Sequence, residues 1–223
     1  MTNMKINLLL ILAFFVSGCS AKINIIDKPI IFNEERIALT KEYFKNHYNM
    51  DKNDISIVPQ MIVLHWTAIP SFERSFKRFE SVHLFSDRTD ISKAGLLNVS
   101  AHFLIDRDGT IYRLMDETTM ARHVIGLNHC TIGVENVARG KKDLSVAQIE
   151  ANIALVKYLK NSYKSIKYLI GHHEYTNFEN HALFKEVDSS YRTEKNDPGD
   201  EFMGEVYEGV NDLSLLPHRS VIR

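Results

Sequence analysis

Three short apolar runs in this sequence each lead into a titratable residue, and this pattern constrains the fold more than any other feature. The runs are residues 61–64, 131–134 and 168–170. They are followed by His65, by Glu135 and, after one glycine, by His172. A charged or polar group at the end of a buried strand is costly unless it is paired, neutralised or bound to metal. Because ligands and catalytic groups gather beyond the carboxyl ends of strands in α/β sheets, we expect the three residues to share one site.

The stretches between these runs have the apolar spacing of helices. Helices are predicted over residues 39–50, 71–85 and 145–160, with Thr40 as a candidate cap of the first and Ser145 opening the third. Asp-Arg-Asp-Gly at 106–109 lies between two alternating runs and predicts a β-hairpin. The pattern favours an α/β domain with a central mixed β-sheet flanked by helices. Residues 39–223 are long enough to form one such domain with its own core.

The N-terminus has the pattern of an export signal. Lys5 precedes nine apolar residues at 8–16, too few to cross a bilayer of roughly 30 Å as a helix. The sequence Val-Ser-Gly-Cys at 16–19 resembles the bacterial lipobox, in which the cysteine is acylated and becomes the new N-terminus. We therefore expect a lipoprotein signal peptide at 1–18, lipidation at Cys19 and a polar tether at 19–38. The alternative is a buried N-terminal helix with an incidental cysteine.

Acylation at Cys19 would place the protein in the cell envelope. Ser20 follows the cysteine, where an aspartate is associated with inner-membrane retention in many Gram-negative bacteria. An outer-membrane anchor facing the periplasm is the resulting expectation. Cys130 would then be the single thiol, so we expect no intramolecular disulfide and a core role for Cys130. A net charge of −1 gives no support to a nucleic-acid partner, and no feature demands an oligomer, so a monomer is expected.

A fourth candidate site residue lies near the end of the chain. In Lys-Asn-Asp-Pro-Gly at 195–199, Pro198 biases Asp197 towards an extended conformation and fixes the direction of its carboxylate. Two imidazoles and one carboxylate make a three-ligand set that leaves a fourth position on zinc for water. Structural zinc sites usually have four protein ligands, often cysteines, which this chain lacks. An open catalytic zinc site is the better interpretation.

Five spaced motifs carry a family resemblance. The segments are MIVLHWTA, SAHFLIDRDGTIYRL, ARH followed by LNHCTIGVEN, LIGHHE and KNDPG. In this order, from about residue 61 to 199, they resemble the zinc-dependent N-acetylmuramoyl-L-alanine amidases, which are relatives of the phage amidase lysozymes and the peptidoglycan recognition proteins. The resemblance implies that family's fold, a Zn²⁺ cofactor and a peptidoglycan or muropeptide substrate.

The resemblance also implies a role for each matching residue. The implied zinc ligands are His65, His172 and Asp197. Glu135 matches the catalytic acid and base, Lys195 the lysine that stabilises the oxyanion, and His123 a substrate-binding histidine that lines the site without binding metal. The alternative for Glu135 is a buried salt bridge, and for Lys195 a solvated loop cation.

The implied reaction is hydrolysis of the amide between N-acetylmuramic acid, or its anhydro form, and L-alanine. The alternatives are a non-catalytic peptidoglycan-binding module and a zinc peptidase that cuts within the stem peptide. The sequence departs from the family pattern in two places. The segment before Asp197 is long, and we expect it to form one side of the groove. Val124 and Ile125 follow His123, where the family often has small residues. His129 and His173 are further histidines that compete for the ligand assignment.

Overall fold

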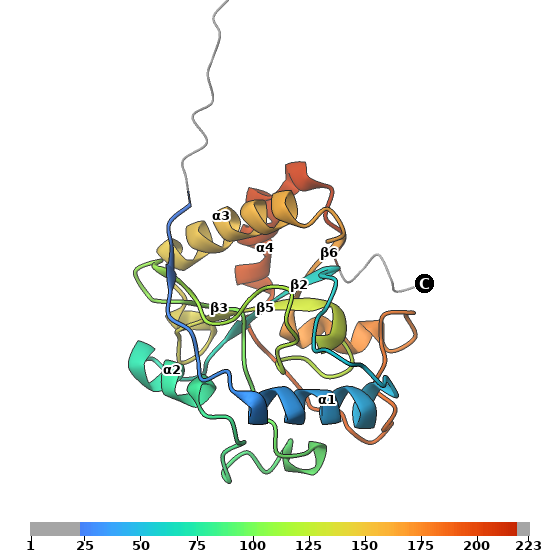
Figure 1. Cartoon of the computed structure of the whole chain (residues 1–223). Coiled ribbons are helices and arrows are strands. Elements are labelled where there is room, and N and C mark those ends of the chain that lie inside the picture. Colours follow the sequence, from blue (N-terminus) through green and yellow to red (C-terminus); the bar gives the residue numbers. More distant parts are fainter. Residues whose placement is uncertain (1–22, 218–223) are drawn as a thin grey trace, which may run out of the picture.

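The computed structural model describes residues 23–217, in which a six-stranded sheet lies between two layers of helices (Figure 1). The strands are β1 (Ile25–Asp27), β2 (Met61–Trp66), β3 (Phe103–Ile105), β4 (Ile111–Arg113), β5 (Thr131–Asn136) and β6 (Tyr168–Gly171). Their order across the sheet is β1-β4-β3-β5-β2-β6, and neighbouring strands are parallel except β3 and β4. The predicted mixed sheet with flanking helices is confirmed.

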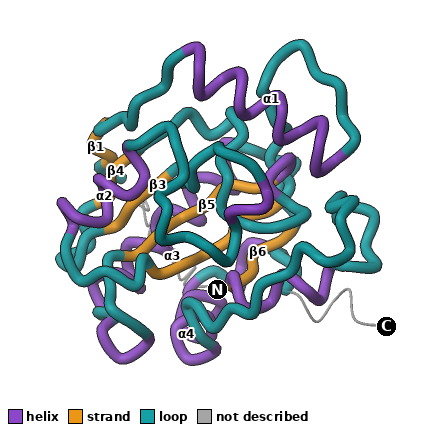
Figure 2. The backbone as a smooth tube through the Cα atoms, turned by 90° about the horizontal axis from the view of Figure 1, so that it is seen from below, coloured by secondary structure: helices purple, strands orange, loops and turns teal. Residues whose placement is uncertain are grey.

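Four α-helices cover the sheet. They are α1 (Glu34–Tyr48), α2 (Phe72–Glu80), α3 (Val146–Ser162) and α4 (Asp200–Gly209). Helices α3 and α4 lie on one face, and α1 and α2 lie on the other (Figures 1 and 2). Short 3₁₀ helices complete the chain: η1 (Ser92–Ala94), η2 (Asn128–Cys130), η3 (Lys141–Asp143), η4 (His172–Phe178) and η5 (Asn211–Leu213).

The central strands are apolar because both of their faces are buried. In β2, residues 61–64 have no exposed surface. One face packs against α3 and α4 through residues such as Leu155 and Val206, and the other packs towards α1 through Phe44. Strands covered on both sides are typical of parallel sheets. The rigid centre of the sheet therefore fixes where its strand ends project.

Two local predictions are confirmed by hydrogen bonds. The Ser145 side chain accepts from the Gln148 N–H at 3.1 Å, and the Gln148 side chain accepts from the Ser145 N–H at 3.0 Å, which is a capping box at the start of α3. The predicted hairpin joins β3 to β4, with Gly109 at φ +87° in its turn. Cys130 is buried, as expected of a core residue, and burial raises the pKa of its thiol to about 12.

The folded domain begins before the predicted boundary at residue 39. Within the segment expected to be a tether, Ile25–Asp27 pairs with β4, and α1 begins at Glu34. The cap of α1 is Asn33, whose side chain accepts from the Arg36 N–H at 3.0 Å. Thr40 is not the cap: it lies inside the helix, where its hydroxyl donates to the Arg36 carbonyl. The predicted signal peptide and Cys19 lie outside the described residues.

Buried Arg36 explains the earlier start of α1. Its guanidinium donates to the carbonyls of Ile31 at 2.6 Å and Ser81 at 2.7 Å, the latter directly after α2. These hydrogen bonds join segments that are distant in the sequence. They stabilise the first turn of α1, although the apolar spacing of residues 34–38 is too weak to predict a helix there. Within the described part of the chain, no helix is both long and apolar enough to cross a bilayer.

Candidate active site

Three strand ends meet at one edge of the sheet, as predicted. In the parallel pairing of β2 with β5, His65 lies directly beside Glu135. On the other side of β2, Leu64 pairs with Gly171, the last residue of β6, so that His172 follows at the same edge. His65 and His172 are buried, and Glu135 is 9% exposed. Strand register alone therefore brings these three side chains together.

Asp197 completes the cluster from the loop that precedes α4. Its Oδ2 lies 3.1 Å from Nδ1 of His172 and 3.3 Å from Nδ1 of His65, and the two Nδ1 atoms are 2.9 Å apart. The backbone carbonyl of Asp197 accepts from the N–H of His173 at 2.9 Å, which fixes the loop against η4. The three predicted ligands thus converge on one point, and together they form a group able to hold a metal ion.

The donor set fits zinc. Ligand atoms about 2.0–2.1 Å from a tetrahedral zinc ion lie roughly 3.4 Å from one another, close to the 2.9–3.3 Å found among these three atoms. Burial, followed by the neighbouring His172, lowers the pKa of His65 to about 4. His65 is therefore neutral at pH 7 and has a lone pair to offer. Burial alone would raise the pKa of Asp197, but the two histidines outweigh it and hold that pKa far below its usual range.

His123 orients His65 rather than joining the three ligands. Its Nδ1 lies 3.0 Å from Nε2 of His65, and its Nε2 lies 3.1 Å from the Thr131 hydroxyl. If His65 donates from Nε2, its Nδ1 keeps the lone pair that a metal requires. The His123 ring packs on Gly133, where a Cβ atom would come within 2.7 Å of it. His123 also lines the groove, as expected of a site-lining residue.

Glu135 is a buried carboxyl with an unsatisfied oxygen. Its Oε2 has no hydrogen-bond partner among the described residues. Burial, together with the negative charge of Asp197, raises the pKa of Glu135 to about 8. The predicted alternative, a buried salt bridge, is not found in the described part of the chain: no ion pair there includes Glu135. A carboxyl that titrates near neutrality beside a metal site is suited to proton transfer.

A groove of about 610 Å³ opens over these residues. Lys195, predicted to act on the oxyanion, lines it, and its positive charge works to lower the pKa values of both Glu135 and His65. The groove also contains arginines that the sequence analysis did not identify. They are Arg74, Arg78, Arg88 and Arg122. Only Arg122 could have been found from the sequence, because it directly precedes His123 in the ARH motif.

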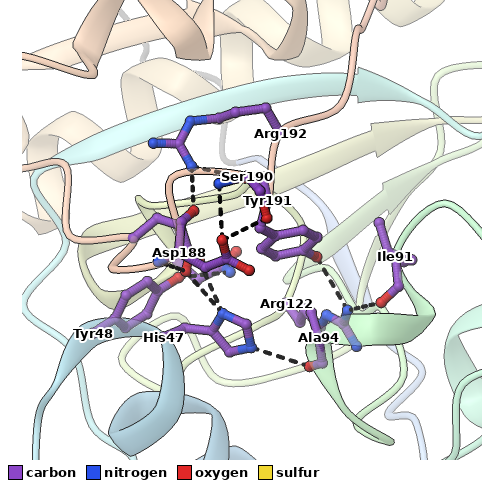
Figure 3. Close-up of polar contacts among 11 residues, drawn as sticks. His47, Tyr48, Ile91, Ala94, Arg122, Asp188, Ser190, Tyr191 and Arg192 are labelled. Carbon is purple, nitrogen blue, oxygen red and sulfur yellow. Dashed lines mark hydrogen bonds and ion pairs between the residues drawn. The ribbon is translucent and has the colours of Figure 1, made fainter.

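The long segment before Asp197 is anchored on α1 and on Arg122 (Figure 3). Nδ1 of His47 lies 3.0 Å from the Glu186 carboxylate, and the Arg122 guanidinium donates to the Tyr191 hydroxyl at 3.2 Å. The rings of His47 and Tyr191 are 5.3 Å apart. The end of this segment, including Glu194, lines the groove, in agreement with the expected wall.

The other unusual residues do not belong to the ligand cluster. Val124 and Ile125 are buried in the apolar core, and they also line a small cavity of about 40 Å³ next to His123 and His172. His129 packs edge-on against Tyr48 and is not part of a metal-binding group among the described residues. His173 directs its ring towards Asp200 instead of joining His172. The ligand assignment therefore rests on His172.

A comparison with known protein families matches the part of the chain that forms this site. The family profile described as N-acetylmuramoyl-L-alanine amidase matches residues 54–200, which include every site residue discussed above. The endolysin of Escherichia phage T7 is 37% identical over 86 residues, and the match spans 36% of this chain and 56% of that relative.

Solved structures share the fold. The amidase LysC from Clostridium intestinale has a TM-score of 0.51 at 21% identity, over 85% of this chain and 99% of that one. A selenomethionine derivative of AmpD has a TM-score of 0.52 at 19% identity, over 86% and 97% of the two chains. At identities this low, the similarity shows a shared fold and nothing beyond it.

Proposed function

This chain belongs to the N-acetylmuramoyl-L-alanine amidase family, and on that premise we propose that it is a zinc hydrolase of peptidoglycan or muropeptides. The bond cleaved is the amide between N-acetylmuramic acid, or its anhydro form, and L-alanine. The observation that carries the proposal is the convergence of His65, His172 and Asp197 beside a buried Glu135 in one groove.

The chemistry divides between the metal and the protein. A zinc ion bound by the three ligands would lower the pKa of water to roughly 7 and polarise the scissile carbonyl. Glu135 takes the proton of the attacking water and delivers it to the departing amine of L-alanine. A pKa of about 8 suits this double task, because the group must accept and release a proton near neutral pH. His123 holds His65 in the tautomer that presents Nδ1.

Lys195 stabilises the negative charge that develops on the carbonyl oxygen. We expect Lys195→Met, which keeps the chain length and removes the charge, to lower kcat by about 10²-fold, since losing one oxyanion donor has effects of this order. Zinc content should stay unchanged, because Lys195 is not one of the three ligands. Steady-state kinetics and metal analysis of Lys195→Met, with Lys195→Arg as the charge-conserving control, test this role. If Lys195→Met has the same kcat as the wild type, Lys195 is a solvated loop cation without a catalytic role.

Product analysis separates this reaction from its rivals. A non-catalytic wall-binding module typically lacks one of the zinc ligands, whereas all three positions are filled here. A zinc peptidase would share the metal chemistry but cut a later bond. Mass spectrometry of digested muropeptides is expected to show free stem peptides that begin with L-alanine. Glycan that stays attached to L-alanine while a later bond is cleaved would contradict the amidase assignment.

We also propose an envelope location through a lipid on Cys19, supported by the lipobox-like sequence at 16–19 and by Ser20. Outer-membrane attachment facing the periplasm would place the groove next to peptidoglycan. Cys19→Ala is expected to move the protein from the membrane fraction to the soluble fraction, with Cys130→Ala as the matched control. Membrane association that survives in Cys19→Ala would argue against acylation at this position.

A further inference from the structure

The small cavity beside His123 lies where the two departures of this sequence from the family pattern meet. Val124 and Ile125 supply part of its apolar lining, and Tyr191 and Thr193 of the long segment line it as well. His123 lines both this side cavity and the catalytic groove, so the two spaces adjoin. The side cavity is therefore built largely from residues in which this chain differs from the family pattern.

Arg122 is a buried cation that lines the side cavity and has only neutral partners (Figure 3). Its guanidinium donates to the carbonyl of Ile91 at 2.9 Å, to the hydroxyl of Tyr191 at 3.2 Å and to the carbonyls of Gly95 and Leu97. All of these bonds come from its two terminal nitrogens. Among residues 23–217, its Nε–H donates to no protein atom and the guanidinium forms no ion pair. The carbonyl dipoles compensate only part of the buried charge.

Two hydroxyl groups of residues that line the side cavity also have no partner in the described part of the chain. They are the buried hydroxyls of Tyr43, which is 3% exposed, and of Thr193. The centre of the Tyr43 ring lies 5.2 Å from the guanidinium carbon of Arg122. Burial raises the pKa of Tyr43 well above its usual value, so its hydroxyl keeps a proton to donate. The backbone of Thr193 is fixed by two hydrogen bonds with the Tyr175 hydroxyl, at 2.8 and 2.9 Å.

The charge and the size of the side cavity suit a small anion. Arg88, which is paired with exposed Asp90 at 3.4 Å, also lines it, and no aspartate or glutamate of residues 23–217 does. Glu186, on the long segment, is already paired with His47 at 3.0 Å. A volume of about 40 Å³ admits about three water-sized atoms, since one water needs roughly 10–15 Å³. A carboxylate group has three heavy atoms.

We propose that the side cavity binds a carboxylate group, which accepts hydrogen bonds from Arg122 Nε–H and from the hydroxyls of Tyr43 and Thr193. An ionised carboxylate only accepts hydrogen bonds, and it supplies the negative charge that Arg122 lacks. This binding does not depend on which bond the enzyme cleaves. If the proposed function holds, the group is a free carboxylate of the stem peptide, and Tyr43 and Thr193 determine which stem peptides are accepted. A free small carboxylate is the other source of the same chemistry.

Formate, the smallest carboxylate, tests the side cavity without any reaction. Titrated into the zinc-loaded full chain, it should cause a saturable shift of one arginine Nε–H resonance in NMR spectra. Tyr43→Phe and Thr193→Val each remove one hydroxyl that has no partner among the described residues, so both variants are expected to fold. Each should bind formate about tenfold more weakly, because one hydrogen bond to a charged group is lost. Tyr48→Phe, which removes a hydroxyl outside the side cavity from the same helix, should bind formate like the wild type.

Two results would overturn the proposal. One is the absence of a saturable arginine shift in the wild type. The other is an equal affinity for formate in the wild type, Tyr43→Phe and Thr193→Val, because the formate would then bind elsewhere.

Kinetics with two muropeptides distinguish the sources of the carboxylate. One muropeptide has free stem-peptide carboxylates, and in the other they are amidated. If the stem peptide fills the side cavity, the wild type should show an about tenfold higher KM for the amidated substrate at the same kcat, and Tyr43→Phe should lose most of this difference. Equal KM values in the wild type would overturn the assignment to the stem peptide and leave a free small carboxylate as the ligand. If formate binds but neither muropeptide is cleaved, the proposed function fails and the carboxylate site stands.

Discussion

Asp197→Ala is expected to release the catalytic zinc ion and lower kcat/KM for muropeptides by about 10³-fold, as the loss of roughly 4 kcal/mol of transition-state stabilisation implies. Asp197 supplies the only carboxylate of the cluster, with Oδ2 3.1 Å from His172 and 3.3 Å from His65. Without it only two imidazole ligands remain, and the cluster has no negatively charged ligand with which to hold the ion. The backbone carbonyl at 197 remains, so the hydrogen bonds from His173 are kept.

Metal analysis and muropeptide digestion of the same sample measure both effects. Glu194→Ala is the matched control, because it removes an exposed carboxylate from the same loop without touching the ligand cluster. That control should retain its zinc and most of its activity. If Asp197→Ala keeps both the catalytic ion and the rate of the wild type, the ligand set assigned here is wrong.

The parts of the site built on strand ends could be predicted from the sequence. Apolar runs at 61–64 and 131–134 locate buried strands, and the residue after each run must then lie at a common edge if the strands are parallel. His65 and Glu135 are neighbours for this reason alone. The start of α3 at Ser145 could also be predicted, because a capping box is a local pattern formed by two residues three positions apart.

The parts of the fold and of the site that could not be predicted depend on contacts between segments that are distant in the sequence. Strand β1 has three residues and no alternation of its own, so its place in the sheet comes only from pairing with β4. The start of α1 is set by carbonyls that accept from Arg36, one of which lies beyond α2. Arg122 is held by the carbonyl of Ile91 and the hydroxyl of Tyr191, partners that no sequence spacing indicates. Long-range hydrogen bonds of this kind have no periodicity to detect.

Glu135→Gln is expected to lower kcat by about 10²–10⁴-fold, the usual contribution of a general acid and base. Glutamine has nearly the same size as glutamate but cannot take a proton from water. Because Glu135 is not among the three ligands, the catalytic zinc ion should remain. The two variants therefore separate two functions: Asp197→Ala loses metal and rate together, whereas Glu135→Gln loses rate alone.

Stability provides an independent check on Glu135. Its pKa rises from 4.5 to about 8 on burial, so the folded protein favours the protonated form. Ionisation therefore costs stability progressively as the pH rises from 4.5 to about 8, a cost that Glu135→Gln avoids. In metal-free protein, Glu135→Gln should gain in Tm relative to the wild type across this range. A purely structural carboxylate would show the reverse, with Glu135→Gln less stable at high pH and no less active.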